Sequence, residues 1–236
     1  MQKASTMKRI ILPALAFWVV LLFNNCIGDD ILDDAVPESV MITNPIDTIG
    51  QGDAYQFEAR FLNNVGIEEN RVVKWTSSAP SLLSIDQNGL ANGLTKGVAV
   101  ITAEVELSGK PPVKDAVQVV IADNTSTNPN DNKRTGKLKA TSSYTLTGDF
   151  TLEKQGSDLI LTLAGNYKAS SSLPGLYVYL SNNPNSIANA LEIGPVKVFD
   201  GAHNYTIGGN IGLNDYAHLL YYCKPFNVKV GEGVFD

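Results

Sequence analysis

The amino-acid sequence predicts an all-β protein built from two antiparallel β-sandwich domains. Short segments in which apolar and polar residues alternate recur along the chain, as in strands that turn one face to a core, and Tyr55–Phe61 is a clear example. The dipeptide Asn88-Gly89 predicts a β-hairpin, because both positions tolerate positive φ. The segment Asp123–Lys133 has no apolar residue apart from one proline, so it predicts a linker between the domains.

Residues 1–25 have the three parts of a secretory signal peptide. A basic start precedes the apolar stretch Ile10–Phe23, which is shorter than the roughly 20 residues needed to span a bilayer. Cys26 follows closely, and the arrangement resembles the acylation site of bacterial lipoproteins, although Asn24 and Asn25 replace the small residues usual there. The resemblance implies an acylated Cys26 that holds the protein on a membrane. The alternative is ordinary signal-peptide cleavage, which would release a soluble secreted protein.

An acidic segment, residues 26–36, follows the signal peptide and contains Asp29, Asp30, Asp33 and Asp34. It resembles the acidic tract with which Bacteroidota lipoproteins are displayed on the outer face of the outer membrane. A flexible, solvated tether would have the same composition. We therefore expect a cell-envelope protein that is lipid-anchored to the outer membrane, with surface display as one alternative. With Cys26 acylated, Cys223 is the one remaining thiol and no internal disulfide can form.

Composition argues against several classes of function. The formal net charge is −6 and no basic stripe exists, which argues against nucleic-acid binding. The two histidines and the scattered carboxylates define no catalytic triad or acid pair, and no Gly-x-Ser-x-Gly or His-Glu-x-x-His motif occurs. We therefore predict a protein that is not an enzyme and that needs no cofactor or metal. An enzyme whose concave site forms only in the folded chain is the alternative.

Residues 37–122 are predicted to form the first sandwich. Three segments resemble the group 2 bacterial Ig-like domain: Val73–Ser78, Ile85–Leu94 and Gly97–Ala103. The resemblance implies an Ig-like sandwich, and a single copy next to an anchor is typical of a spacer. We expect Trp75 to be a core anchor rather than a ligand-stacking residue. Asp53 and Asp86 are interpreted as turn residues rather than calcium ligands, because no regularly spaced acidic loop surrounds them.

Residues 134–236 are predicted to form the second sandwich, with one short helix expected at residues 184–191. Strands are expected at Leu138–Ala140, Tyr144–Leu146, Phe150–Leu152, Leu159–Leu163, Leu176–Leu180, Leu191–Ile193, Val196–Phe199, Tyr205–Ile207, Leu219–Cys223 and Phe226–Val230. This region resembles the DM13 domain at Ser143–Asp149, Leu176–Ser181, Gly201–Ile207, Leu219–Val228 and Gly231–Phe235. Two positions depart from that family: Pro174-Gly175 stands where Gly-Pro-Asp is usual, and Tyr222 rather than tryptophan precedes Cys223.

The run Leu219–Cys223 is apolar on both parities, which predicts a strand covered on both faces, ended by Pro225. Because side chains alternate along a strand, Leu219, Tyr221 and Cys223 should share one face. His218, Leu220, Tyr222 and Lys224 should share the other.

Two interpretations of Cys223 follow. A lone cysteine in an apolar run is typically a small buried hydrophobe. The DM13 resemblance instead implies a role in electron transfer, for which a thiol needs a lowered pKa, a partner sulfur, or a bound metal or cofactor. His203 could approach Cys223 through the fold, but one histidine and one cysteine fall short of a four-ligand zinc site.

Tyrosines concentrate in the second domain, and they could line a ligand groove or belong to the core and sheet surface. The candidate ligand-lining residues are Tyr177, Tyr179, Tyr222 and His203. Two functions therefore remain. The first is a non-enzymatic envelope protein in which an Ig-like spacer presents a DM13-like domain to an envelope or extracellular partner. The second is an electron-transfer or redox-sensing domain that acts through Cys223.

Overall fold

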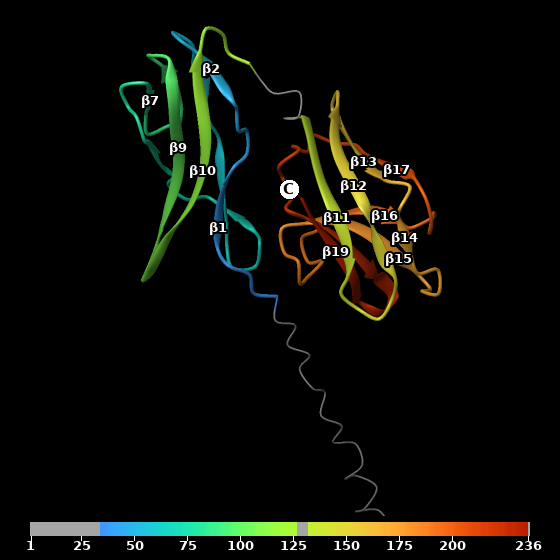
Figure 1. The fold of residues 1–236 in the computed structure, drawn as a ribbon. Coiled ribbons are helices and arrows are strands. Elements are labelled where there is room, and N and C mark those ends of the chain that lie inside the picture. Colours follow the sequence, from blue (N-terminus) through green and yellow to red (C-terminus); the bar gives the residue numbers. More distant parts are fainter. Residues whose placement is uncertain (1–33, 127–131, 236) are drawn as a thin grey trace, which may run out of the picture. The chain divides into compact units, whose positions relative to one another are not determined.

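The computed structural model describes residues 34–126 and 132–235, and Figure 1 shows their fold. Within these residues the regular structure is made of strands, apart from short 3₁₀ turns, which confirms the predicted all-β class. Two separate hydrophobic clusters form the cores, one within residues 40–121 and one within residues 138–235. The signal-peptide features and Cys26 lie outside the described residues, so those predictions concern a part of the chain about which the structure says nothing.

The first sandwich contains three small sheets, with strand orders β1-β4-β5, β2-β10-β9-β6 and β3-β8-β7. Its strands are β1 (Ser39–Ile42), β2 (Thr48–Gly50), β3 (Ala54–Gln56), β4 (Ala59–Leu62), β5 (Glu68–Glu69), β6 (Lys74–Ser77), β7 (Leu83–Ile85), β8 (Leu90–Gly93), β9 (Gly97–Leu107) and β10 (Lys110–Ala122). All strand pairs are antiparallel except β2 with β10, which run parallel. The long β9–β10 hairpin supplies alternate residues to the core, among them Ile101 and Ile121.

The predicted single strand Tyr55–Phe61 is in fact two strands that belong to different sheets. The chain leaves the β3 ladder at Phe57, whose backbone N–H donates to the carbonyl of Gly89, and Glu58 donates to the Asn44 side chain. Phe57 itself is buried. The alternating pattern therefore predicted correctly that Phe57 is buried, but it could not show that the chain crosses from one sheet to another.

The hairpin predicted at Asn88-Gly89 is confirmed, since β7 and β8 pair antiparallel. Its turn differs from the expected one: Gly89 has a φ of 84°, whereas Asn88 does not adopt positive φ. The Asp86 carboxylate accepts hydrogen bonds from the backbone N–H groups of Asn88 and Leu90, so this aspartate shapes the turn. Trp75 is half-buried against the core, with its ring centroid 6.0 Å from that of Phe57.

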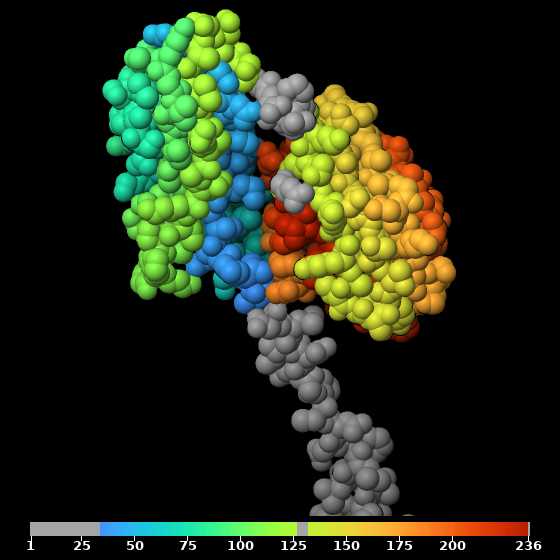
Figure 2. All heavy atoms as spheres, viewed as in Figure 1, coloured from blue at the N-terminus to red at the C-terminus, as the bar shows by residue number. Residues whose placement is uncertain are grey.

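The second sandwich is a nine-stranded sheet with the order β16-β15-β18-β19-β11-β12-β13-β17, in which β14 also pairs with β12. Its strands are β11 (Lys133–Ala140), β12 (Leu146–Gln155), β13 (Asp158–Leu163), β14 (Lys168–Ala169), β15 (Leu176–Ser181), β16 (Leu191–Pro195), β17 (His203–Ile207), β18 (His218–Cys223) and β19 (Val228–Phe235). All pairs are antiparallel. Figure 2 shows one face of the molecule with all heavy atoms, in which the second sandwich is coloured from yellow-green to red.

Several local predictions for this sandwich were wrong. Residues 184–190 form turns instead of a helix and Leu191 begins β16, and Asn189 adopts a φ of 62°, which a right-handed helix cannot contain. Residues 144–145 and 196–199 are not strands.

The strand expected at Phe226–Val230 begins only at Val228, because Lys224–Phe226 form the 3₁₀ helix η3. Pro225 suits this first turn, where its missing N–H is not needed. Asn227 then ends the turn in the left-handed region, with a φ of 49°.

Candidate functional site

Cys223 lies at the end of β18, in the middle of the second sandwich. Strand β18 pairs with β15 on one side and with β19 on the other, which places Cys223 opposite Leu176 and Val228. The side chain is 1% exposed and the thiol is free. Because a strand with a neighbour on each side and a covered face offers no approach, reagents in solution cannot reach the sulfur in the folded protein.

The predicted alternation along β18 is confirmed for Leu219 to Cys223, whereas Lys224 lies beyond the strand, in η3. Leu219, Tyr221 and Cys223 belong to the interior core of the sandwich. Leu220 and Tyr222 belong to a smaller cluster with Tyr179. The alternation of side chains along the strand therefore places the sulfur on the same face as Tyr221.

An aromatic cluster lies in the interior core on the Tyr221 face, and we call its members Tyr167, His203, Tyr205 and Tyr221 the interior cluster. The ring centroids of Tyr205 and His203 are 5.4 Å apart, those of His203 and Tyr167 are 4.8 Å apart, and those of Tyr167 and Tyr221 are 6.2 Å apart. The first two contacts are edge-to-face, a favourable arrangement for aromatic rings. The rings thus form one continuous row from Tyr205 on β17 to Tyr221 on β18.

The polar atoms of the interior cluster are buried and lack partners. The hydroxyls of Tyr167, Tyr205 and Tyr221 and the Nε2 atom of His203 make no hydrogen bond of ordinary geometry within the described residues. His203 Nδ1 lies 3.0 Å from the carbonyl oxygen of Gly201. Since a carbonyl can only accept, Nδ1 carries the proton in the neutral imidazole, and Nε2 presents a lone pair to the interior.

Burial also keeps the phenols of the interior cluster protonated. It raises the pKa of Tyr167, of Tyr205 and, most strongly, of Tyr221. Tyr167 adds to the rise in the pKa of Tyr221, so the two side chains influence each other electrostatically. All three hydroxyls are therefore proton donors at physiological pH.

The other face of β15 and β18 carries Tyr177, Tyr179 and Tyr222. Tyr222 donates a hydrogen bond to the carbonyl of Asn185 at 3.0 Å, and Tyr179 donates to the Glu192 carboxylate at 3.1 Å. Burial, followed by the neighbouring Glu192, raises the pKa of Tyr179 to about 12.

Lys224 binds Glu192 at 2.7 Å, and its ammonium group lies 4.7 Å from the centroid of the Tyr177 ring. The hydrogen bond from Lys224 lowers the pKa of Glu192. Three of the four candidate ligand-lining residues thus lie together on this face. The fourth, His203, belongs to the interior cluster instead.

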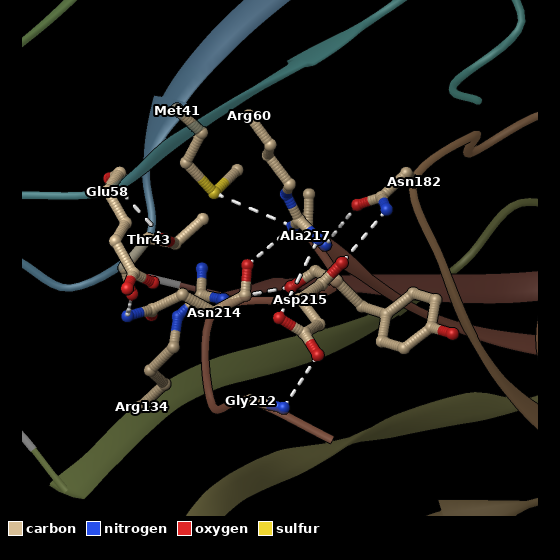
Figure 3. Close-up of polar contacts among 11 residues, drawn as sticks. Met41, Thr43, Glu58, Arg60, Arg134, Asn182, Gly212, Asn214, Asp215 and Ala217 are labelled. Carbon is tan, nitrogen blue, oxygen red and sulfur yellow. Dashed lines mark hydrogen bonds and ion pairs between the residues drawn. The ribbon is translucent and has the colours of Figure 1, made fainter. Parts of the chain in front are cut away.

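A second polar centre surrounds Arg60 on β4, as Figure 3 shows. The guanidinium donates to the carbonyl of Asn214 and lies 3.8 Å from the Asp215 carboxylate. Asn182 donates to the carbonyl of Asp215 and accepts from Ala217 N–H. Burial lowers the pKa of Arg60, while the nearby Asp215 opposes this effect. These contacts satisfy the polar groups of the loop that precedes β18.

The structure adds two observations about ligands and membranes. No group of three or more histidine, cysteine or acidic side chains within the described ranges is arranged to hold a metal ion. None of the helices in residues 34–126 and 132–235 is long and apolar enough to cross a bilayer.

The second sandwich matches a known protein family. Residues 135–234 match the family described as Electron transfer DM13. The matched segment begins in β11 and ends in β19, so it includes Cys223 and the whole interior cluster. The DM13 resemblance of the second sandwich is therefore confirmed.

The other comparisons carry less information. No curated protein matches the chain. A solved structure, the S-layer protein SbsC domains 4 and 5, is 11% identical with a TM-score of 0.27. That match covers 84% of this chain and 96% of the S-layer chain, but its TM-score is too low to inform the fold.

Sequence reasoning singled out His203 but noted its neighbours Tyr167 and Tyr205 only among the tyrosines that concentrate in the second domain, not as candidate site residues. Tyr167 lies between β13 and β14, outside any strand, so no periodic pattern marks it as buried. The three residues meet because β17 pairs with β13. A local pattern cannot report such a pairing.

Proposed function

We propose that this chain is a non-enzymatic, lipid-anchored protein of the cell envelope whose C-terminal sandwich transfers single electrons through Cys223. The observation that carries the proposal is the position of the one described cysteine, buried within a segment that matches the Electron transfer DM13 family. The N-terminal sandwich would space this domain from the membrane, and Cys26 would carry the lipid.

The burial of Cys223 selects among the kinds of thiol chemistry. Disulfide exchange and peroxide reduction need direct access of a dissolved partner to a thiolate, and a sulfur that is 1% exposed in an apolar core offers none. Transfer of a single electron does not need contact between the sulfur and the oxidant. The proposed reaction converts the thiol to a thiyl radical. The electron passes to an outer-sphere oxidant such as a high-potential metal complex, and the proton ends on the imidazole of His203, whose Nε2 makes no hydrogen bond within the described residues.

A partner-binding role is the second candidate, and the surface beside Cys223 favours it. Phe226 is 67% exposed and Val228 is 42% exposed, although both follow Leu219–Cys223, which is buried throughout. Exposed large apolar side chains next to each other are typical of contact surfaces. An envelope or extracellular protein is the partner that would dock there.

A one-electron oxidation experiment tests the proposal. Purified full-length protein is mixed with tris(bipyridine)ruthenium(II) and persulfate, and a light flash generates the ruthenium(III) oxidant. We expect the free thiol, titrated after denaturation, to disappear with the ruthenium(III) signal, and a spin trap to report a sulfur radical that is absent from Cys223→Ser. Persistence of the thiol after repeated flashes would contradict electron transfer through Cys223.

The lipid anchor needs a separate measurement. Mass spectrometry of the protein purified from membranes should show a mature chain that begins at an acylated Cys26. The Cys26→Ala variant should lose radiolabelled palmitate and leave the membrane fraction. An unmodified mature N-terminus would exclude lipidation.

A further inference from the structure

The interior cluster contains more buried polar groups than packing of the core requires. Tyr167 and Tyr221 are both 0% exposed, and neither hydroxyl makes a hydrogen bond of ordinary geometry within the described residues, although the two phenols lie close enough to influence each other's pKa. A buried hydroxyl without a partner lowers stability by about 1–3 kcal/mol, and phenylalanine would fill the same volume without that loss. Unsatisfied buried groups of this kind call for an explanation such as a redox role or an ordered water.

The opposite face of the same strands provides an internal comparison. Tyr179 and Tyr222 are also buried, but each hydroxyl has a protein acceptor. The sandwich can therefore satisfy a buried tyrosine by ordinary means. Only the row that includes Tyr221 combines unsatisfied phenols with an imidazole nitrogen that can accept a proton.

The row of rings has an inner and an outer end. Its inner end, Tyr221, stands two residues from Cys223 on the same face of β18, a spacing of about 7 Å along a strand. Its outer end, Tyr205, is half-buried on β17, which is an edge strand of the sheet. The row therefore extends from the vicinity of the sulfur to the margin of the sandwich.

We propose that Tyr205, His203, Tyr167 and Tyr221 form a relay that carries an electron from Cys223 to a one-electron oxidant docked at the edge strand β17. This inference rests on the proposed electron transfer through Cys223 and assigns its route. The oxidant is a high-potential, outer-sphere metal centre, because a phenol yields an electron only to a strong one-electron acceptor.

Each step of the relay balances in electrons and protons. The oxidant takes one electron from Tyr205, whose hydroxyl proton passes to Nε2 of His203, which leaves a neutral phenoxyl radical and an imidazolium. A hydrogen atom then moves from Tyr167 to Tyr205, and another from Tyr221 to Tyr167. Finally the Cys223 thiol gives its hydrogen atom to Tyr221. The net result is a reduced oxidant, a thiyl radical and a protonated His203.

The test compares tyrosine variants of the full chain in the flash experiment with ruthenium(III). Tyr167→Phe preserves the packed ring but cannot form a phenoxyl radical under these conditions. We expect the rate of Cys223 thiol loss to fall by about tenfold or more in Tyr167→Phe. It should stay unchanged in Tyr144→Phe, the control, because Tyr144 is an exposed tyrosine of the same sandwich that lies outside the row. A second measurement uses Cys223→Ser, in which freeze-quench electron paramagnetic resonance should show a tyrosyl radical that lives longer than in the wild type.

The outcomes separate the relay from the function on which it rests. If the thiol is lost equally fast in wild type, Tyr167→Phe and Tyr221→Phe, the relay is wrong while electron transfer through Cys223 stands. If the wild-type thiol survives every flash, the proposed function itself fails. If the tyrosyl radical seen in Cys223→Ser persists unchanged after Tyr205→Phe is added to the same chain, the radical lies outside the row and the relay is again contradicted.

Discussion

Loss of the hydroxyl group should change the free energy of unfolding in opposite directions at Tyr221 and Tyr222, two adjacent residues of β18. Tyr221→Phe removes a fully buried hydroxyl that makes no hydrogen bond of ordinary geometry, so it should raise the free energy of unfolding by about 1–3 kcal/mol. Tyr222→Phe removes the hydrogen bond to the Asn185 carbonyl, which should lower the free energy of unfolding by about 1 kcal/mol. The two variants differ from wild type by the same single atom. Their difference therefore isolates the environment of the hydroxyl from the packing of the ring.

Urea unfolding measures this difference. With a slope of about 2–3 kcal/mol per molar urea for a chain of this size, the midpoint should rise by roughly 0.5 M for Tyr221→Phe and fall by a similar amount for Tyr222→Phe. Near-ultraviolet circular dichroism is the appropriate signal for the second sandwich. Tryptophan fluorescence is not, because Trp75, the one tryptophan among the described residues, reports the first sandwich.

One result would refute the reasoning. If Tyr221→Phe lowers the urea midpoint as much as Tyr222→Phe does, the Tyr221 hydroxyl has a hydrogen-bond partner in solution, such as an ordered water. The unsatisfied phenols that motivate the relay would then be ordinary hydrated core residues.

Three further predictions concern the same sandwich. Burial lowers the pKa of His218 below 6.5 in the folded protein. As the pH falls below about 6.5, the unfolded chain therefore binds a proton at this residue before the folded chain does, and the free energy of unfolding decreases. His218→Gln should flatten this part of the pH dependence of the urea midpoint, and an unchanged slope would contradict the assignment. Gly148 has a φ of 136°, and a Cβ there would lie 2.6 Å from the Cα of Tyr167; Gly148→Ala should therefore lower the free energy of unfolding by about 1–3 kcal/mol. Gly165→Ala, which meets nothing within 4 Å, is the control and should change thermal stability little. Cys223→Ser should lower the free energy of unfolding by about 1–3 kcal/mol, because the core around Cys223 is apolar and offers no hydrogen-bond partner to a hydroxyl. If Cys223→Ser lowers it no more than Cys223→Ala does, the serine hydroxyl has a hydrogen-bond partner and the reasoning is wrong.

The fold class and the two faces of β18 could be predicted because both depend on period-two alternation, which is a local property. Leu219 to Cys223 are covered on both sides in the structure, as their apolar run indicates. The same local reasoning failed where the chain changes its partner without changing its pattern. The segment at Phe57 keeps its alternation while it passes from the β3 ladder to the β4 ladder.

The sequence by itself therefore determined that this chain forms strands with defined inner and outer faces, and that its thiol is placed in an apolar run. Only the tertiary structure decided which aromatic rings lie near that thiol. Tyr167 comes from a loop, His203 and Tyr205 from an edge strand, and Tyr221 from a central strand. They meet because antiparallel pairing and closure of the sandwich bring together residues that are far apart in sequence. The strand pairing is stabilised by many cross-strand contacts over the whole sheet, so no single segment of the sequence specifies it.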